Sequence, residues 1–293
     1  MDPTPTQDAP APLYTPPANT LEKALPAPGE TLSDDAILDR FTAWVAAQGL
    51  ELYPHQEEAL LELSGPNHLV LSTPTGSGKS LVATFLHFQA LCRGERSIYT
   101  CPIKALVNEK FFALCDALGP RNVGLLTGDG AVNPDAKVVV CTAEVLSSMV
   151  LRDPLFNAAQ VVMDEFHYYA DRERGVAWQI PLLLCEKTRF LLMSATLGDM
   201  TSIAAQLAET SKRAVSRVTT VERPVPLEYS YAEVPLHETL EELVAKGRAP
   251  VYLVNFSQRA AAERTQDLMS ADFSTKVEAI IANRGGAIIL SAG

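Results

Sequence analysis

The sequence has little of what a membrane-spanning, secreted or zinc-bound protein needs. No apolar run approaches the roughly 20 residues that span a bilayer, and no basic residue precedes Lys23, so neither a membrane span nor a signal peptide is expected. The five cysteines are widely spaced, with no Cys-x-x-Cys pair, which argues against a zinc site or a disulfide framework. We therefore expect the reducing cytoplasm as the compartment.

Positive charge is also scarce. The 24 Lys and Arg residues stand against 35 Asp and Glu residues, which gives a net charge of −11. This balance argues against a protein that holds polyanions over a general basic surface, so any contact with nucleic acid must be local. Hydrophobic residues make up 47% of the 293 residues, which is enough for a core in one large or two smaller domains.

Changes in composition divide the chain into four parts. Residues 1–32 are rich in proline and alanine and are expected to form a disordered tail. In residues 33–222, short apolar runs alternate with helix-length segments, which is typical of a parallel sheet covered by helices on both faces. Residues 223–247 are expected to be a linker with a connecting strand at 227–233 and a helix. Residues 248–293 begin a second α/β domain but are long enough for only about one βαβ unit.

The most informative stretch is Thr73-Pro-Thr-Gly-Ser-Gly-Lys-Ser80, which lies between an apolar run at 68–71 and a helix-like segment at 81–92. A phosphate-binding loop requires this context. Its glycines let backbone N–H groups close around a triphosphate, Lys79 can reach the outer phosphates, and the Ser80 hydroxyl can ligate Mg²⁺. The residues expected to bind the nucleotide are Thr75, Gly76, Ser77, Gly78, Lys79 and Ser80.

Two carboxylates follow the apolar run 160–163, in the sequence Asp164-Glu-Phe-His167. They are expected at the edge of the sheet where ligands bind in open α/β folds. Asp164 suits a contact to Mg²⁺, and Glu165 suits the polarisation of the water that attacks the γ-phosphate. For His167 we expect a contact with the next motif or with the nucleotide. An Asp-Glu pair that stood alone would more simply be a solvated strand end.

The tripeptide Ser194-Ala-Thr196 ends the next apolar run, 190–193, and should lie beside the two carboxylates. Its hydroxyls can bond the carboxylate cluster, so Ser194 and Thr196 are expected to couple that cluster to movement of the chain. Serine and threonine are common at strand ends and helix caps, which makes this tripeptide weak evidence by itself.

These three motifs, in this order, resemble those of superfamily-two helicases of the DExH type. Loops of the Pro-Thr-Gly-Ser-Gly-Lys kind in that superfamily commonly lack the first glycine, where Thr73 stands here. The stretch His167-Tyr-Tyr-Ala-Asp-Arg-Glu-Arg-Gly-Val-Ala-Trp178 resembles the extended second motif of the superkiller-like RNA helicases, a branch that includes exosome-associated helicases. Further matches are Tyr99-Thr-Cys-Pro-Ile-Lys-Ala-Leu106, Thr127-Gly-Asp129 and Cys141-Thr-Ala-Glu-Val-Leu146, and Gln179 stands where the family usually has Glu.

The resemblance implies a RecA-like P-loop domain followed by an incomplete second RecA-like domain, with ATP and Mg²⁺ as cofactors. Gln56, with Tyr53 nearby, would read the adenine, because an amide both donates and accepts. An exposed glutamine at the start of a helix is the plainer alternative. Lys79, Asp164 and Glu165 would carry out hydrolysis, with Ser80 and Asp164 at the metal. Residues on motifs that contact the nucleic-acid backbone in this family are Pro102, Lys104, Gly128, Thr142 and Glu144.

Two further features bear on activity. Asp171, Arg174 and Gly175 resemble the family's Asp-x-x-Arg-Gly element, for which we expect a structural role in an ion pair that holds the loop after Glu165. In addition, no Gln-x-x-Gly-Arg-x-Gly-Arg stretch is present to supply the second domain's arginines, which act on the developing phosphate charge. The chain is therefore expected to be an N-terminal fragment of a larger helicase.

Three functions remain open from the sequence. The first is an ATP-dependent helicase that acts on RNA with a single-stranded segment, with RNA-degradation proteins as possible partners. The second is a module that binds ATP and RNA without turnover of its own. The third is a DNA-repair translocase, because a DNA branch of the superfamily shares the same motifs.

Overall fold

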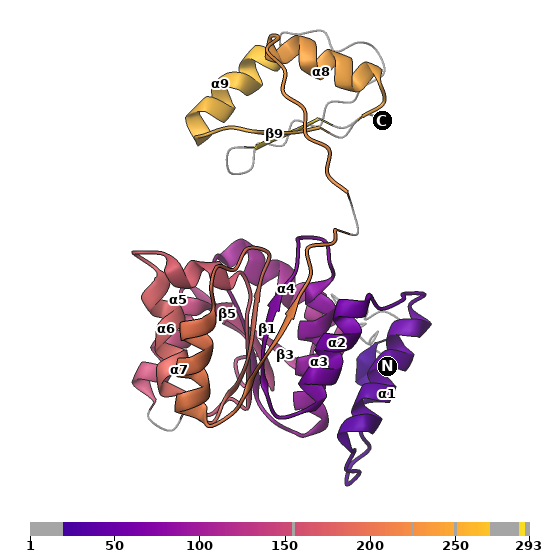
Figure 1. Cartoon of the computed structure of the whole chain (residues 1–293), viewed down its shortest axis with the longest axis vertical. Helices are drawn as coiled ribbons and strands as arrows, with labels where there is room; N and C mark the ends of the chain where they lie inside the picture. The colour runs from indigo at the N-terminus through magenta and orange to yellow at the C-terminus, as the bar shows by residue number, and fades with distance from the viewer. Residues whose placement is uncertain (1–19, 154–155, 224–225, 249–250, 270–286, 291–293) are drawn as a thin grey trace, which may run out of the picture. The chain divides into compact units, whose positions relative to one another are not determined.

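A computed structural model describes residues 20–153, 156–223, 226–248, 251–269 and 287–290. The chain divides into two compact units, Met1–Pro226 and Leu227–Gly293, and Figure 1 shows the elements of each. Each unit has a hydrophobic core of its own. Residues 1–19 of the predicted tail and most of residues 270–293 lie outside the described residues.

The first unit is built on an eight-stranded sheet in the order β4-β3-β5-β2-β6-β7-β1-β8. Every neighbouring pair is parallel except β3 and β4. Six of these strands lie at the positions where apolar runs predicted them. The strands are β1 (His68–Ser72), β2 (Ser97–Cys101), β3 (Val123–Thr127), β4 (Gly130–Val132), β5 (Val138–Thr142), β6 (Gln160–Met163), β7 (Arg189–Ser194) and β8 (Val215–Thr219).

Helices cover both faces of this sheet, with α1 to α4 on one face and α5 to α7 on the other (Figure 1). Alternate residues of each strand serve the two faces, so Leu69 and Leu71 of β1 join one core and Val70 joins the other. The predicted α/β fold is confirmed. The helices are α1 (Asp34–Ala47), α2 (Pro54–Ser64), α3 (Lys79–Cys92), α4 (Lys104–Leu118), α5 (Ala143–Arg152), α6 (Gly175–Leu184) and α7 (Thr201–Ser211).

Two strands were missed by the sequence analysis. β4 is exposed along its whole length, and β8 buries only Val218 fully. Neither strand has the continuous apolar run by which the other strands were found, because both lie at an edge of the sheet. β4 completes a hairpin with β3, and β8 shields the outer side of β1.

The predicted disordered tail is too long. Thr20 and Leu21 are buried, and a short 3₁₀ helix, η1 (Leu21–Ala24), packs against α1 and α4. Arg40 of α1 donates to the carbonyl of Ala24 at 3.1 Å and pairs with the Glu30 carboxylate. Buried side chains and the bonds of Arg40 thus hold a segment whose composition alone indicates disorder.

The second unit contains α8 (Leu236–Ala245), β9 (Val251–Val254), α9 (Gln258–Met269) and β10 (Ala287–Leu290). Leu240 and Leu268 form its small core. The strand predicted at 227–233 is wrong, since those residues have no regular structure. The predicted βαβ unit is also not seen here, because β9 and β10 pair antiparallel. Two strands joined through a helix can pair in either direction, although only parallel pairing requires such a connection.

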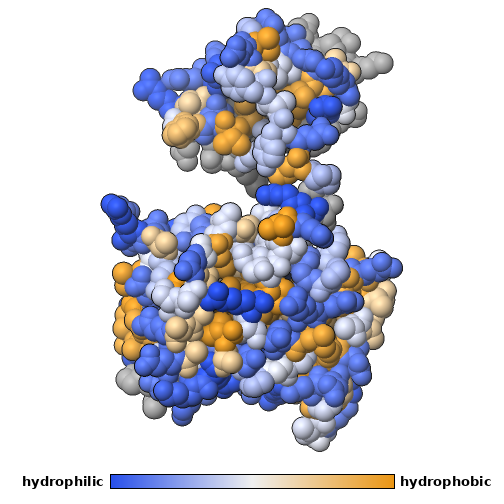
Figure 2. Space-filling view, in the orientation of Figure 1, coloured by the Kyte–Doolittle hydropathy of each residue, from blue (hydrophilic) through white to orange (hydrophobic). Residues whose placement is uncertain are grey.

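The surface and the cysteines of the described residues agree with what the composition predicts, namely no membrane span and no disulfide framework. On the face that Figure 2 shows, apolar residues of the first unit lie in separate patches among polar ones. Within the described residues, no helix has the length and apolarity needed to cross a bilayer. All five cysteines are free, and burial raises the pKa of the Cys141 thiol to about 12.

Replacing Leu21 by Ala tests whether the end of the predicted tail belongs to the fold. The side chain is 0% exposed, so we expect the free energy of unfolding of the first unit to fall by about 2 to 5 kcal/mol. Urea unfolding followed by fluorescence reports on this unit, because both tryptophans, Trp44 and Trp178, lie in it. Leu50→Ala, at a side chain that is 53% exposed, is the matched control. If Leu21→Ala leaves the unfolding midpoint unchanged, the segment does not belong to the fold and the prediction of a disordered tail stands.

Candidate active site

The candidate site lies where β1, β7 and β6 end side by side. Ser72 of β1 is paired with Ser194 of β7, and Leu192 of β7 is paired with Met163 of β6. Because parallel strands end at the same edge, the segments that follow these strands must meet there. Three of the predicted motifs therefore converge on one edge of the sheet.

The loop after β1 is held in a tight turn by its own side chains. Gly76 and Gly78 have φ angles of 85° and 77°, in the left-handed region that glycine adopts without strain. A Cβ at Gly78 would also lie 2.2 Å from the Gln56 amide nitrogen. The buried hydroxyls of Thr73 and Ser77 are 2.6 Å apart. Thr73, which stands where the general pattern has glycine, thus stabilises the loop through a hydrogen bond to Ser77.

Lys79, the first residue of α3, crosses this loop. Its ammonium donates to the carbonyl oxygens of Thr73 at 2.7 Å and Pro74 at 3.0 Å. Burial lowers the pKa of Lys79, and the nearby carboxylates of Glu165 and Asp164 partly offset that effect. The amine and the two carboxylates thus share one electrostatic environment.

Gln56 joins α2 to the loop. Its amide oxygen accepts from the backbone N–H of Tyr53 at 2.9 Å, and its amide nitrogen donates to the carbonyls of Ser77 and Gly78 at 3.3 and 3.1 Å. The Tyr53 ring, 42% exposed, stacks on His55. In this state the amide is occupied by the protein itself, and the adenine contact stays a prediction.

Asp164 and Glu165 follow β6 in different environments. Asp164 is 8% exposed, and the Tyr99 hydroxyl donates to its Oδ2 at 2.6 Å. Its Oδ1 accepts from the backbone N–H of Glu165 at 3.0 Å. Glu165 has a φ of 53°, a left-handed conformation that costs roughly 1 kcal/mol for a residue with a side chain. The turn holds one carboxylate inside the protein and leaves the other partly exposed.

His167 connects the carboxylates to the strand beside them. Its Nδ1 lies 3.0 Å from the Ser194 hydroxyl and 3.3 Å from Glu165 Oε2. The backbone N–H of Thr196 in turn donates to the Ser194 hydroxyl at 3.3 Å. A continuous polar path therefore runs from Glu165 to the segment after β7, while the coupling role of Ser194 and Thr196 stays a prediction.

The residues predicted to contact nucleic acid lie at the same edge, after β2, β3 and β5. Lys104 pairs with Asp129 at 2.9 Å, and both side chains are largely exposed. Thr142 caps α5 by accepting from the backbone N–H of Val145 at 3.4 Å. Around Gly128 there is open space. The structure thus brings these residues to one edge but engages Lys104 and Thr142, and through Arg174 also Pro102 and Glu144, in contacts within the protein.

Arg174 links two of the predicted segments. It donates to the Glu144 carboxylate, at 2.9 Å from Nε and 2.6 Å from Nη2, and to the Pro102 carbonyl. Asp171 instead accepts the backbone N–H groups of Glu173 and Arg174, and these bonds lower the pKa of Asp171. The ion pair at this loop is therefore between Arg174 and Glu144. In the described structure Glu144 holds an arginine, where the sequence analysis had assigned it to nucleic acid.

Gly175 is also explained by a close approach, since a Cβ there would lie 2.4 Å from the Tyr169 carbonyl oxygen. Its structural role is steric.

Sequence reasoning missed two residues of the site. Tyr99 lies inside β2 and is fully buried, and a polar ring in an otherwise buried strand was the only signal available. Lys110 of α4 reaches the Ser80 hydroxyl at 3.3 Å, and nothing in its helical segment marks it. Both contacts depend on elements that meet only in the folded chain.

The donors at this edge suit a triphosphate and Mg²⁺. The first turn of α3 has no side-chain cap, and Lys79 lies beside it. Ser80 and Asp164 offer the hard oxygen ligands that Mg²⁺ takes. No group of three or more metal-binding side chains occurs in the described part of the chain. A Mg²⁺ ion here would therefore take its remaining ligands from phosphate and water, as it usually does beside nucleotides.

Comparison with known proteins agrees with this arrangement. A family model described as DEAD/DEAH box helicase matches residues 53–203, just over half of the chain. The antiviral helicase SKI2 of Saccharomyces cerevisiae is 36% identical over 181 residues, 61% of this chain and 14% of SKI2. A probable helicase, HelY, of Mycobacterium tuberculosis is 38% identical over 199 residues, 67% of this chain and 22% of HelY. The ATP-dependent RNA helicase mtr4 of Schizosaccharomyces pombe is 36% identical over 61% of this chain and 16% of its own length.

These matches confirm the resemblance to DExH helicases that the motifs predicted. The chain spans between 14% and 22% of the length of these relatives. Among solved structures, the DUF1998 helicase MrfA has a TM-score of 0.59 at 20% identity, covering 79% of this chain and 41% of MrfA. The Pyrococcus furiosus Hef helicase domain has a TM-score of 0.50 at 17% identity, covering 76% of this chain and 49% of the domain. These two likenesses support the fold.

Proposed function

We propose that this chain, which belongs to the DEAD/DEAH box helicase family, provides the first motor domain and part of the second domain of an ATP-dependent RNA helicase. The observation that carries the proposal is the meeting of the loop 73–80 with Asp164, Glu165 and Ser194 at one edge of the sheet. The alternatives, a binding module without turnover and a DNA translocase, are outcomes of the tests below.

RNA is the proposed substrate because of the relatives and the second motif. SKI2-like and mtr4-like sequences share 36% identity with this chain, and mtr4 is named an ATP-dependent RNA helicase. The stretch from His167 to Trp178, which carries the resemblance to the RNA branch, is built into this site through His167 and Arg174. RNA-degradation proteins are the proposed partners, and the cytoplasm is the proposed compartment, in keeping with five free thiols.

The loop 73–80 and the start of α3 are proposed to bind the nucleotide. ATP bound with Mg²⁺ would supply a phosphoanhydride bond whose cleavage can be coupled to movement. Lys79 would exchange its bonds to the carbonyls of Thr73 and Pro74 for phosphate oxygens. Ser80 and Asp164 would hold the metal, and Lys110 beside the Ser80 hydroxyl adds positive charge. Lys79 therefore exchanges neutral acceptors for anionic ones, which strengthens each hydrogen bond.

Glu165 is proposed as the group that orients the attacking water and accepts its proton. Its carboxylate is partly exposed and is held by the left-handed turn after Asp164. Because His167 Nδ1 lies within 3.3 Å of Glu165 and 3.0 Å of Ser194, a change at the carboxylate can shift the hydrogen bonds of β7. This path is the proposed route from hydrolysis to movement.

RNA is proposed to run along the same edge, past the ends of β2, β3 and β5. Lys104, the Thr142 hydroxyl and nearby backbone N–H groups can bond phosphate oxygens without reading sequence. Glu144 would act through Arg174, which it holds against the Pro102 carbonyl. Such local contacts reconcile RNA binding with a net charge of −11.

Substituting Glu165 by Gln tests the hydrolytic role. The amide cannot accept a proton, so we expect single-turnover hydrolysis of ATP by the complete helicase to which this chain is proposed to belong, with single-stranded RNA present, to slow by about 10²-fold to 10⁴-fold. Affinity for MgATP should remain unchanged, since the variant keeps the loop and Asp164. Glu173→Gln, at an exposed carboxylate of the same segment, is the control.

Three outcomes of that experiment would contradict the proposal in different ways. Undiminished turnover in Glu165→Gln removes the assigned role of this carboxylate. ATP binding without any RNA-stimulated turnover in the complete parent protein favours the binding module. Equal or greater stimulation by single-stranded DNA than by RNA favours the DNA translocase.

Tyr99→Phe tests whether the Tyr99 hydroxyl positions Asp164. Without it, Asp164 Oδ2 loses a donor at 2.6 Å, and we expect MgATP to bind about five- to tenfold more weakly. ATP in the presence of EDTA should bind as before, because only the metal depends on the orientation of this carboxylate. Tyr169→Phe removes the same group elsewhere and serves as the control. Equal loss of affinity with and without Mg²⁺ would assign Tyr99 a structural role.

A further inference from the structure

A cavity of about 750 Å³ opens at the opposite edge of the sheet, where the strands begin. The segments that lead into β1, β2, β5, β6, β7 and β8 all contribute to its wall. β1 is five residues long, so the cavity lies about 16 Å of strand away from the loop at the other edge. Its charged lining residues are Asp34, Arg93, Glu95, Arg96, Lys137, Lys187, Arg189 and Arg213.

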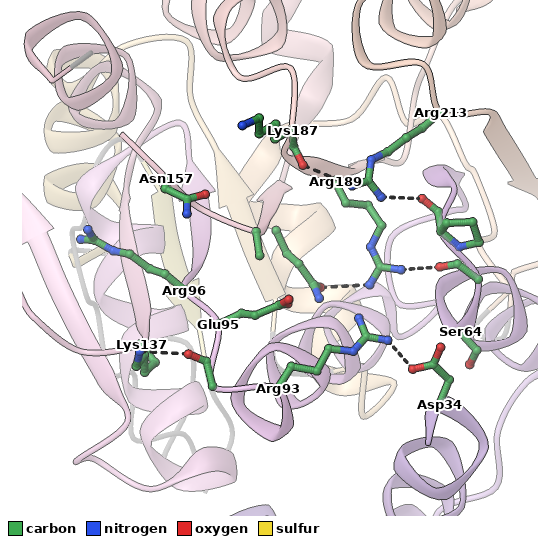
Figure 3. Close-up of a pocket in the computed structure, with 15 residues that line it drawn as sticks. Asp34, Ser64, Arg93, Glu95, Arg96, Lys137, Asn157, Lys187, Arg189 and Arg213 are labelled. Carbon is green, nitrogen blue, oxygen red and sulfur yellow. Dashed lines mark hydrogen bonds and ion pairs between the residues drawn. The ribbon is translucent and has the colours of Figure 1, made fainter. Parts of the chain in front are cut away.

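Positive charge is concentrated in this cavity, although the chain as a whole is acidic. Six of the 24 Lys and Arg residues line this one cavity, beside two carboxylates. One of those carboxylates, Asp34, is already paired with Arg93. In the view of Figure 3, Arg189, Arg213 and Arg93 lie on one side, and Arg96 and Lys137 on the other. A protein with a net charge of −11 thus has a strongly cationic hollow.

Arg189 is the most constrained of these cations. It is 4% exposed, and its guanidinium donates to neutral acceptors, namely the carbonyls of Leu63 and Gly65 and the amide oxygens of Gln89 and Gln160. Within the described residues it forms no ion pair with a carboxylate. Burial, then the charges of Arg93 and Arg213, lower the pKa of Arg189 to about 10. A buried cation without a counterion is costly, and an anion in the cavity would offset that cost.

A second observation points the same way. The Nε of Arg96 is buried and has no hydrogen-bond partner in the described structure. Buried polar nitrogens are normally satisfied, so this unpaired donor adds to the uncompensated positive charge around the cavity. Glu95 acts in the opposite sense, because its carboxylate lines the cavity and raises the pKa of Arg189.

We propose that this cavity is a binding site for linked phosphate groups, separate from the nucleotide loop. Four of its six cations are arginines, whose planar guanidinium groups match phosphate oxygens in pairs. A volume of about 750 Å³ accommodates several consecutive phosphates rather than a single ion. Such groups come from a small polyphosphate or from the backbone of an RNA strand.

The test measures the binding of inorganic tripolyphosphate by calorimetry at low salt. Every variant also carries Lys79→Ala, so that binding of tripolyphosphate to the loop at the other edge does not contribute to the measured affinity. Arg96→Gln with Lys187→Gln should weaken binding about tenfold in total, since two cations leave the cavity. Glu95→Gln should tighten binding, because it removes the opposing charge. Arg121→Gln, at an exposed residue outside the cavity, should change the affinity by less than about twofold.

Arg189 itself is kept in these variants, because its removal takes a donor from four acceptors at once, the carbonyls of Leu63 and Gly65 and the amide oxygens of Gln89 and Gln160. A single-stranded uridine oligonucleotide forms the second arm. If its affinity also falls with Arg96→Gln and Lys187→Gln, the phosphates in the cavity are those of RNA. If only tripolyphosphate responds, they belong to a small polyphosphate. The proposal is overturned if tripolyphosphate does not bind the Lys79→Ala chain, or if the cavity substitutions affect its binding no more than Arg121→Gln does.

Discussion

The pairing of β7 with β1 on one side and β6 on the other is the constraint on which the site depends. This register places Ser194 beside the start of the loop and one strand away from Asp164. All three strands are buried on both faces, so a slip of one residue would move every side chain of a strand to the wrong core. Hydrophobic packing of the sheet thereby fixes the positions of polar groups at its edge.

Charged side chains at the two edges of the sheet have different partners. At the edge where the strands end, carboxylates and cations lie close together. Lys79 is bound by carbonyls of the loop, and Asp164 by Tyr99. At the other edge, the partners of Arg189 in the described structure are neutral acceptors, and further cations surround it. An acidic chain can therefore present two separate places for anions without a basic surface.

Much of this arrangement could be predicted from the sequence. The buried strands appear as apolar runs, and loop residues such as Gly76 and Gly78 are needed for a backbone conformation that other residues rarely adopt. The rest required tertiary contacts. Tyr99 and Lys110 reach the site from elements remote in sequence, and the partner of Arg174 is Glu144, 30 residues away. Leu21 shows the same limit, because its burial depends on helices remote in sequence, which the composition of its own segment does not reveal. The cationic cavity gathers residues from seven separate segments, and no local pattern marks it.

The central claim is that the edge formed by β1, β7 and β6 binds a nucleoside triphosphate through Lys79. Equilibrium binding of MgATP to the parent chain and to Lys79→Ala tests it most directly, with Lys212→Ala, at an exposed lysine of the first unit, as the control. The account predicts that the parent binds, that Lys79→Ala binds about 10- to 100-fold more weakly, and that the control matches the parent. Equal affinity of the parent and Lys79→Ala for MgATP would contradict it.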